Sequence, residues 1–284
     1  MYDNYKVIAV TPAGRKRYLE ILVKYMVRLR PVLDAWHLWV NTDNQDDINY
    51  FKELEGHYDF IKVVESPEPA KVKDNKTIHK FFVNCTDPDT IYVRFDDDIV
   101  FVESKTFSEF LKFRIDNPNY FLVYANIINN GITTHLLQRC GVLPEPNKIG
   151  YCDYVCFDRI GWEKPETAEI VHDVFLKNIS NLEIFKSFKL WHLHHYERCS
   201  INCISWLGRD FAQFNGIVGW DEEDWLSVEH PTSLKKTNCI FGDFVVSHFA
   251  FFTQRQYLEE NTNYLECYSK LADHSEYILS KSAL

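Results

Sequence analysis

The run Val93–Phe101 constrains the fold of this chain more than any other segment, because apolar residues flank three consecutive carboxylates, Asp96, Asp97 and Asp98. Such a run is typical of a buried strand, and we expect its last turn to deliver the acids to the edge of a sheet. Neighbouring carboxylates repel one another and burial adds to the cost of each charge, so a positive group must share the site. Mg²⁺ or Mn²⁺ with a phosphorylated substrate meets this need, because these ions bind one or two protein carboxylates and complete their shell with phosphate and water oxygens. The alternative is a solvated turn after an edge strand.

The composition indicates a globular protein with room for one large domain. The chain has 284 residues, 46% of them hydrophobic, and only 10 glycines and 10 prolines, which excludes disordered and low-complexity classes. Its net charge of −10 provides no basic surface for the phosphates of DNA or RNA, so we expect no nucleic-acid partner. An acidic enzyme still binds an anionic nucleotide where a metal and a few basic residues reverse the charge of the cleft.

The N-terminus and the hydropathy pattern predict a cytoplasmic protein. The first residues, Met1–Lys6, begin no cationic and apolar leader, and no stretch approaches the ~18 apolar residues of a membrane span. We therefore expect no integral membrane segment. The eight cysteines are scattered along the chain, as suits reduced thiols in a cytoplasmic protein.

Strands alternate with helices along the first half of the chain. Strands are predicted at Lys6–Val10, Ala35–Val40, Asp59–Val64 and Tyr120–Ala125, and helices at Arg15–Arg30, Asp46–Leu54 and Asn75–Phe82. This alternation predicts an α/β fold with a mostly parallel central sheet flanked by helices. Ligands of such sheets bind beyond the carboxyl ends of the strands. The turn from Thr11 to Gly14, the tip Asn41–Asp43 and the three acids would then line one crevice.

The second half of the chain is less regular, although a helix is predicted at Pro165–Lys177. No internal repeat or flexible linker divides the sequence. We therefore expect a single domain over residues 1–284, in which the second half extends the first.

The segment Gly216–Leu226 is the second feature with chemical content. Its glycines allow a close approach, Trp220 offers a flat apolar face to a sugar-like ring, and the acids that follow Asp221 begin a helix. One of those acids suits a general base. The alternative is the ordinary preference of helix N-termini for Asp and Glu.

Three further residues allow both a functional and a structural interpretation. His248 lies in the apolar run Phe241–Phe252, where a lone histidine is more often a core residue than a metal ligand. Asp210 follows Arg209, which would be its ion-pair partner. Arg15 suits contact with diphosphate oxygens, but a solvated helix face explains it equally well.

Taken in order, these features resemble the GT-A class of nucleotide-sugar-dependent glycosyltransferases, and family 2 in particular. The resemblance covers most of residues 5–252 and rests on the turn Thr11–Gly14, the tip Asn41–Asp43, the pair Asn75 and Lys76, the Asp-x-Asp motif Asp96–Asp98, Gly219–Asp224 and His248. It implies a GT-A-like single domain with a Rossmann-like nucleotide-sugar-binding half over about residues 1–125. An acceptor-binding and catalytic half would occupy about residues 126–255, and a helical tail residues 256–284.

The resemblance also implies roles for particular residues. Asp96, Asp98 and His248 would hold Mn²⁺ or Mg²⁺. Glu223 would be the general base, with Glu222 and Asp224 as rivals, and the product would have an inverted anomeric configuration. A UDP- or GDP-sugar would be the donor, and a glycan or other hydroxyl compound the acceptor. Contacts to the donor would come from Thr11, Pro12, Ala13, Arg15, Asn41, Asp43, Asn75, Lys76, Asp96 and Asp97, and contacts to the acceptor from Trp220 and Asp210. The chain departs from the best-known inverting pattern, Gly-Trp-Gly-x-Glu-Asp, by carrying Asp221 at the third position.

Other classes remain as alternatives. Phosphohydrolases of the haloacid dehalogenase type also place Asp-x-Asp at a strand end, with the first Asp as nucleophile, but on the first strand of the core domain. A carbohydrate-binding protein without catalytic activity would use the aromatic residues alone. A sugar nucleotidyltransferase is disfavoured because no glycine-rich phosphate loop opens the first turn.

Overall fold

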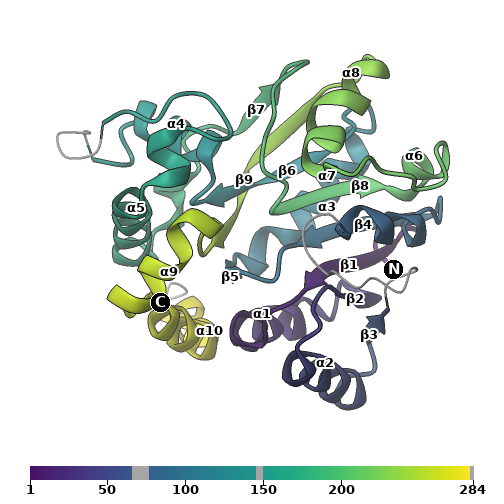
Figure 1. Ribbon diagram of the computed structural model, residues 1–284, viewed down its shortest axis with the longest axis horizontal. Helices are drawn as coiled ribbons and strands as arrows, with labels where there is room; N and C mark the ends of the chain where they lie inside the picture. The colour runs from purple at the N-terminus through teal and green to yellow at the C-terminus, as the bar shows by residue number, and fades with distance from the viewer. Residues whose placement is uncertain (66–76, 145–149, 282–284) are drawn as a thin grey trace.

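One continuous mixed sheet organises the molecule. The computed structural model describes residues 1–65, 77–144 and 150–281, and within them nine strands form one sheet in the order β3-β2-β1-β4-β8-β6-β9-β5, with β7 also paired to β9 (Figure 1). The strands are β1 (Lys6–Ala13), β2 (Ala35–Val40), β3 (Ile61–Val64), β4 (Thr90–Phe95), β5 (Ile99–Val102), β6 (Val123–Ile128), β7 (Leu190–Leu193), β8 (Cys203–Leu207) and β9 (Asn238–His248).

The first half of the sheet is parallel, as the sequence predicts. β1 pairs in parallel with β2 and β4, and β2 with β3. β8 is antiparallel to both β4 and β6, so it joins the first half to the second, where β9 runs parallel to β6. The α/β prediction with a mostly parallel central sheet is confirmed, and the antiparallel pairs of β5, β7 and β8 complete it.

This topology brings distant segments to one edge of the sheet. Because β8 is antiparallel to both of its neighbours, β4 and β6 point the same way. The carboxyl ends of β1, β2, β4, β6 and β9 therefore lie at the same edge as the amino ends of β5 and β8. Ligands of open α/β sheets bind at this edge. The predicted crevice therefore receives residues from both halves of the chain.

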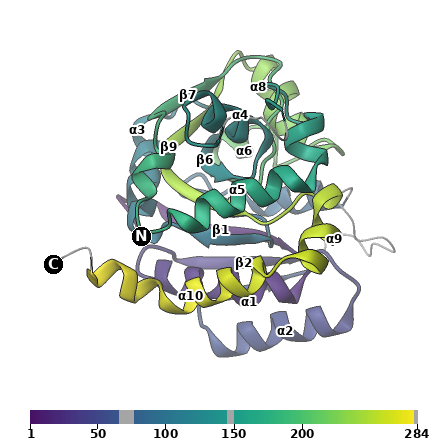
Figure 2. The ribbon, with the colours of Figure 1, turned by 90° about the vertical axis from the view of Figure 1, so that its left-hand side faces the viewer.

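Helices cover the sheet. They are α1 (Lys16–Leu29), α2 (Gln45–His57), α3 (Phe107–Asp116), α4 (Gly131–Arg139), α5 (Pro165–Lys177), α6 (Gly208–Ala212), α7 (Glu222–Asp224), α8 (His230–Ser233), α9 (Phe252–Asn261) and α10 (Tyr264–Lys281), with short 3₁₀ or π turns η1 (Ile78–Asn84), η2 (Ser104–Thr106), η3 (Arg159–Glu163), η4 (Leu182–Phe185) and η5 (Trp225–Glu229). Figure 2 shows α1, α2 and α10 side by side beneath β1 and β2. Lys24 Nζ lies 2.6 Å from Asp273 Oδ1, so the predicted helical tail packs against α1. In the described part of the chain, every helix is too short or too polar to cross a membrane.

Two predicted elements differ from the structure at the sheet edge where the three acids lie. The run Val93–Phe101 is two strands, because Ile99 N donates a hydrogen bond to Asp96 O (3.1 Å) and the acids form the turn between β4 and β5. β1 continues through the predicted turn as far as Ala13, because Thr11, Pro12 and Ala13 pair with β2. The missing N–H of Pro12 is tolerated there, since the pairing of β1 with β4 ends at Val10.

The remaining differences concern boundaries. The strand predicted at Tyr120–Ala125 is β6, which begins and ends three residues later. Residues 75 and 76 of the predicted helix Asn75–Phe82 lie outside the described residues, and its remainder belongs to the 3₁₀ helix η1. The helix predicted at Pro165–Lys177 has these bounds as α5.

We predict that Trp206 stabilises the junction between the two halves of the sheet. This β8 residue is fully buried and stacks on Tyr92 of β4 and on Phe211, with ring centroids 5.6 and 5.0 Å away. Trp206→Ala is expected to lower the free energy of unfolding by about 3–5 kcal/mol, measured by chemical denaturation. Trp206→Phe is the matched control: it keeps much of the packing and removes an indole N–H that has no partner among the described residues, so its cost should be clearly smaller. Equal losses for the two variants would contradict this assignment.

Candidate active site

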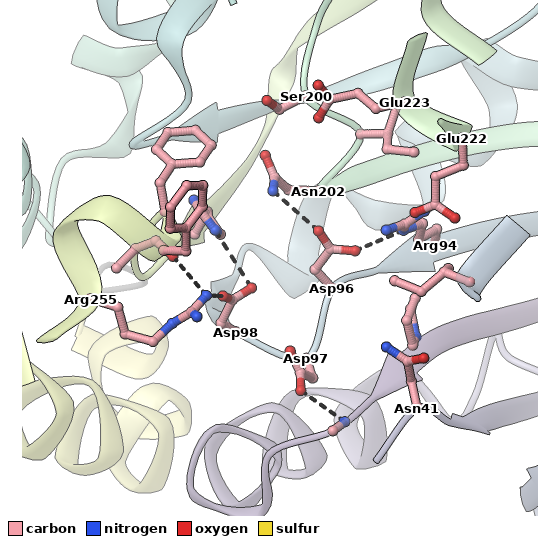
Figure 3. Close-up of a pocket in the computed structure, with 18 of the residues that line it drawn as sticks. Asn41, Arg94, Asp96, Asp97, Asp98, Ser200, Asn202, Glu222, Glu223 and Arg255 are labelled. Atoms are coloured by element: carbon pink, nitrogen blue, oxygen red, sulfur yellow. Dashed lines mark hydrogen bonds and ion pairs between the residues drawn. The ribbon is translucent and has the colours of Figure 1, made fainter. Parts of the chain in front are cut away.

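The acidic turn opens into a cavity of about 620 Å³ at the predicted edge of the sheet. Its lining includes Pro12, Gly14 and Arg15 after β1, Asn41 after β2, and all three acids of the turn. Residues 220 and 221, just before α7, and residues 222 and 223, in α7, line it as well. His248 closes β9 at the same place, and Arg255 reaches it from α9. Figure 3 shows residues from both halves of the chain around the carboxylates.

Asp97 fixes the turn that follows β1. Its carboxylate accepts a hydrogen bond from Gly14 N (3.0 Å) and pairs with the Arg15 guanidinium through Nε, 3.1 Å from each oxygen. Asp97 is buried, and these contacts account for both of its oxygens. Asp97 therefore holds the turn that follows β1. Because both of its oxygens have partners, neither is left free in the cavity for the predicted contact with a nucleotide.

Asp98 is the most strongly partnered acid. Its Oδ2 accepts a hydrogen bond from Arg255 (3.0 Å) and forms an ion pair with Arg15 (2.9 Å), while its Oδ1 lies 3.5 Å from His248 Nε2. Burial alone would raise the pKa of Asp98, but the positive charges of Arg15 and Arg255 outweigh it and lower the pKa below the ordinary value. Asp98 is therefore an anion throughout the neutral range.

Asp96 points away from His248 and toward the other side of the cavity. Its Oδ1 accepts a hydrogen bond from Arg94 Nε (2.7 Å) and its Oδ2 one from Asn202 Nδ2 (3.1 Å), as Figure 3 shows. Burial raises its pKa, although Arg94 opposes the shift. The structure thus brings Asp98 and His248 together as predicted, while both oxygens of Asp96 are held by other partners.

The arrangement of Asp98 and His248 fits a cation that binds together with its substrate. His248 Nδ1 lies 3.0 Å from the carbonyl oxygen of Asn129, which makes Nδ1 the N–H donor and leaves a lone pair on Nε2 of the neutral ring. That lone pair faces a carboxylate oxygen, and a backbone carbonyl that fixes the tautomer is the usual support of a metal-binding histidine. Two atoms 3.5 Å apart can both lie at about 2.1 Å from one ion. No group of three such protein ligands occurs among the described residues, so the other ligands would come from substrate and water.

Glu222 and Glu223 differ although they are adjacent. Glu222 is buried, and its Oε1 accepts a hydrogen bond from Arg94 NH1 (2.8 Å), while its Oε2 has no partner in the described part of the chain. Burial raises the pKa of Glu222 to about 7 against the opposing charge of Arg94. Glu223 Oε1 accepts from Arg198 Nε (2.9 Å), and Figure 3 shows its side chain directed toward Ser200.

Arg198 holds the rest of the acidic loop. Its guanidinium bonds both oxygens of Asp221 (2.9 and 3.0 Å) and lies 3.3 Å from Asp224 Oδ1. Asp224 does not line the cavity, so the geometry favours Glu222 and Glu223 over it as a base. Trp220 lines the cavity and is 71% exposed, as an acceptor-binding residue would be.

Several predicted site residues lie elsewhere. Thr11 is buried and its Oγ1 accepts the indole N–H of Trp36 (2.9 Å), and Ala13 is buried in the β1 ladder. Asp43 is exposed and outside the cavity lining. Asp210, in α6, pairs with Lys236 Nζ (3.2 Å) and does not line the cavity. The geometry therefore does not support its predicted role in acceptor binding. Asn75 and Lys76 lie outside the described residues.

The sequence interpretation missed Arg94, Arg198, Asn202 and Arg255. Arg94 carried a signal, because an arginine in a buried apolar strand must be paired, and three acids follow within four residues. Asn202 and Arg198 precede β8 in an irregular stretch, and Arg255 lies in α9, so only the tertiary structure brings them to the acids.

Comparisons with known proteins concern the fold of this chain and give no information about its activity. No protein-family model matches the chain, and no curated protein is similar to it in sequence. Among solved structures, 4-diphosphocytidyl-2C-methyl-D-erythritol synthase from Anaerococcus prevotii is 12% identical with a TM-score of 0.46, covering 93% of this chain and 100% of its own. CMP:2-keto-3-deoxy-manno-octonic acid synthetase, in complex with CTP, is 12% identical with a TM-score of 0.45, covering 90% and 96%. A mannose-6-phosphate isomerase from Helicobacter pylori is 10% identical with a TM-score of 0.38, covering 86% and 98%. Likeness at this level carries no argument about activity, and the resemblance to GT-A glycosyltransferases stays a prediction.

We predict that Glu222 makes the stability of the protein fall between about pH 4.5 and pH 7. Because its pKa is raised on folding, the folded chain holds a proton there that the unfolded chain has released, and stability decreases as the pH rises through this range. The shift corresponds to a loss on the order of 3 kcal/mol. Glu222→Gln should remove most of this pH dependence in denaturation measurements, whereas Glu20→Gln, on the exposed face of α1, should leave it unchanged. The same slope in Glu222→Gln and the unmodified chain would show that Glu222 does not titrate there.

Proposed function

We propose that this chain is a metal-dependent glycosyltransferase that moves a sugar from a nucleoside-diphosphate sugar to a hydroxyl acceptor. One observation carries the proposal. Asp98 Oδ1 and His248 Nε2 face each other across 3.5 Å in a cavity that Glu222 also lines, and one buried oxygen of Glu222 has no partner within the part of the chain that the structure describes. A cation site and a candidate base in one cavity are what a single displacement at an anomeric carbon requires.

The donor would bind beside the acidic turn. Arg15 and Arg255 line the cavity there, and Arg255 Nε is buried without a hydrogen-bond partner among the described residues. Guanidinium groups bind phosphate oxygens through charged hydrogen bonds, so these two residues suit the diphosphate, with Pro12 and Asn41 on the nucleoside side. Mn²⁺ or Mg²⁺, held by Asp98 and His248, would stabilise the charge of the departing nucleoside diphosphate.

The acceptor hydroxyl would lose its proton to Glu222. Its Oε2 is free of partners in the described structure, and a pKa of about 7 lets it accept a proton at neutral pH and release it after the reaction. Arg94 bonds the other oxygen and also bonds Asp96, so it orients the base relative to the acidic turn. Glu223 is the second candidate, although Arg198 already holds its Oε1. A base on the acceptor side suits single displacement, which inverts the anomeric configuration of the product.

The geometry supports the two alternative functions less well. A phosphohydrolase would need Asp96 as its nucleophile, but Arg94 and Asn202 hold both Asp96 oxygens. A carbohydrate-binding protein without catalytic activity would have no use for a buried carboxylate with a raised pKa in its binding cavity, whereas perturbed carboxylates are typical of active sites.

We predict that Mn²⁺ and a nucleoside diphosphate stabilise the protein only together. Two protein ligands bind the ion weakly, and the diphosphate oxygens complete its shell. Thermal unfolding with UDP, GDP or CDP should therefore shift upward for one nucleotide when Mn²⁺ is present, and shift little with either component alone.

His248→Ala should abolish this joint stabilisation, and His195→Ala, at an exposed histidine outside the cavity, should retain it. An equal shift by the nucleotide in the presence of EDTA would rule out the metal-dependent site, and no shift with any nucleotide would rule out the donor site.

We predict that Glu222→Gln lowers the rate of donor hydrolysis about 10²- to 10⁴-fold, the usual scale for a lost general base. Release of nucleoside diphosphate from the UDP- or GDP-sugar that binds provides the assay, because water then takes the place of the acceptor. Glu223→Gln, the neighbouring variant, should have the smaller effect while both variants keep the nucleotide-induced thermal shift. If Glu223→Gln causes the larger loss, Glu223 is the base.

A further inference from the structure

A group of aromatic side chains lines the same cavity as the charged turn without being buried in the core. Phe157 is 45% exposed and Phe252 is 68% exposed, and both line the cavity together with Trp162. Their rings are in contact, since the Trp162 centroid lies 5.2 Å from that of Phe157 and 5.1 Å from that of Phe252. We call these three residues the aromatic wall. Apolar rings left open to water at a cavity indicate a ligand surface rather than core packing.

The aromatic wall stands on a fixed backbone. Asp158 begins η3 by accepting hydrogen bonds from Ile160 N (2.9 Å) and Gly161 N (2.6 Å). Gln254 of α9 donates to Gly161 O (3.1 Å), which ties the segment of Phe157 and Trp162 to the helix of Phe252. A binding surface on such connected elements is set in place before the ligand arrives.

One guanidinium joins the aromatic wall to the acidic loop. Arg198 Cζ lies 4.7 Å from the centroid of Phe157, and its Nε donates to Glu223 Oε1 (2.9 Å). Phe157 and Glu223 therefore lie next to the same side chain. A ring stacked on the aromatic wall would have its edge directed toward the carboxylates of the loop.

These surfaces match the two surfaces of a sugar. A pyranose offers an apolar C–H face that stacks on aromatic rings and an edge of hydroxyl groups that hydrogen-bond to carboxylates and guanidinium groups. Trp220, on the acidic loop, adds a further exposed ring to the same cavity. We propose that the acceptor is a carbohydrate whose ring stacks on the aromatic wall, an inference that rests on the proposed transferase function.

The charges of the cavity argue against a lipid acceptor. Its lining carries Arg15, Arg94, Arg198 and Arg255 as well as the acids of the turn and of the loop. An acyl or prenyl chain would have to cover these groups and remove their hydration, which costs several kcal/mol for each ion. A hydroxylated ring takes the place of water in the hydrogen bonds.

The test measures binding of simple glycosides to the protein with Mn²⁺ and the stabilising nucleoside diphosphate present. Saturation-transfer NMR with methyl glycosides of hexoses, N-acetylhexosamines, deoxyhexoses and uronic acids, and with their disaccharides, identifies a ligand and its stacked face. Phe157→Ala and Phe252→Ala should each weaken that ligand about tenfold, and Phe252→Tyr should restore most of the affinity. Tyr257→Ala is the matched control, because Tyr257 is a partly exposed aromatic residue of the same helix outside the cavity.

The outcomes separate this inference from the proposed function. The joint shift by nucleotide and Mn²⁺ tests the donor site, and it should be unchanged in Phe157→Ala and Phe252→Ala. If the donor site is intact but no glycoside binds, or a glycoside binds equally well to the alanine variants, the carbohydrate acceptor is refuted while the transferase stands. Preferential binding of a serine- or threonine-containing peptide or of a detergent-solubilised prenyl alcohol would refute it as well. Loss of the nucleotide shift in the unmodified chain would instead refute the donor site.

Discussion

The ion pairs of the acidic turn are the constraint on which the rest of the site depends. Three consecutive carboxylates are folded into a sheet edge, and guanidinium groups neutralise all three: Asp96 pairs with Arg94, Asp97 with Arg15, and Asp98 with both Arg15 and Arg255. Breaking one partner of a buried pair leaves an uncompensated charge, at a cost of about 3–5 kcal/mol. The ion pairs of the turn therefore connect the end of β4 to the end of β1 and to α9. The shape of the cavity depends on these charged contacts as well as on apolar packing.

The sequence predicts the fold well and the site in part. Alternating strands and helices were sufficient for the parallel half, because each strand is a short apolar run between turn residues. The acids, Arg15 and Asn41 follow strands, and they line one cavity at the edge where the parallel strands end. Residues 220–223 and His248 line the same cavity, although only the resemblance to a family grouped them with the acids. Local patterns fail where contacts between distant segments decide the outcome. Thr11 was predicted in a turn but pairs with β2 as part of β1, and Asp210 was predicted to bind the acceptor but forms an ion pair with Lys236. The need for positive charge was evident, yet the partner Arg255 lies 157 residues from Asp98, which no local pattern reveals.

Adjacent acids acquire different chemistry from their surroundings. Glu222 and Glu223 are equivalent in sequence, and a motif assigns the base by position alone. In the structure Glu222 is buried with one oxygen on Arg94 and one that has no partner among the described residues, while Glu223 is held by Arg198 near the aromatic wall. Environments that separate the properties of two carboxylates also separate the roles they can take, which in the proposed transferase are proton acceptor for Glu222 and part of the binding surface for Glu223.

The same arginines that neutralise the turn are suited to receive a diphosphate. Asp98 occupies one nitrogen of Arg255, whose buried Nε lacks a partner in the described structure, and Arg15 is partly exposed to the cavity. A guanidinium has five N–H donors and can bond a carboxylate and a phosphate at once. A cation between Asp98 and His248 would add the positive charge that the incoming diphosphate requires, so the ion and the nucleotide each make binding of the other more favourable. Charge balance thus links the folding of the turn to the joint binding of its two ligands.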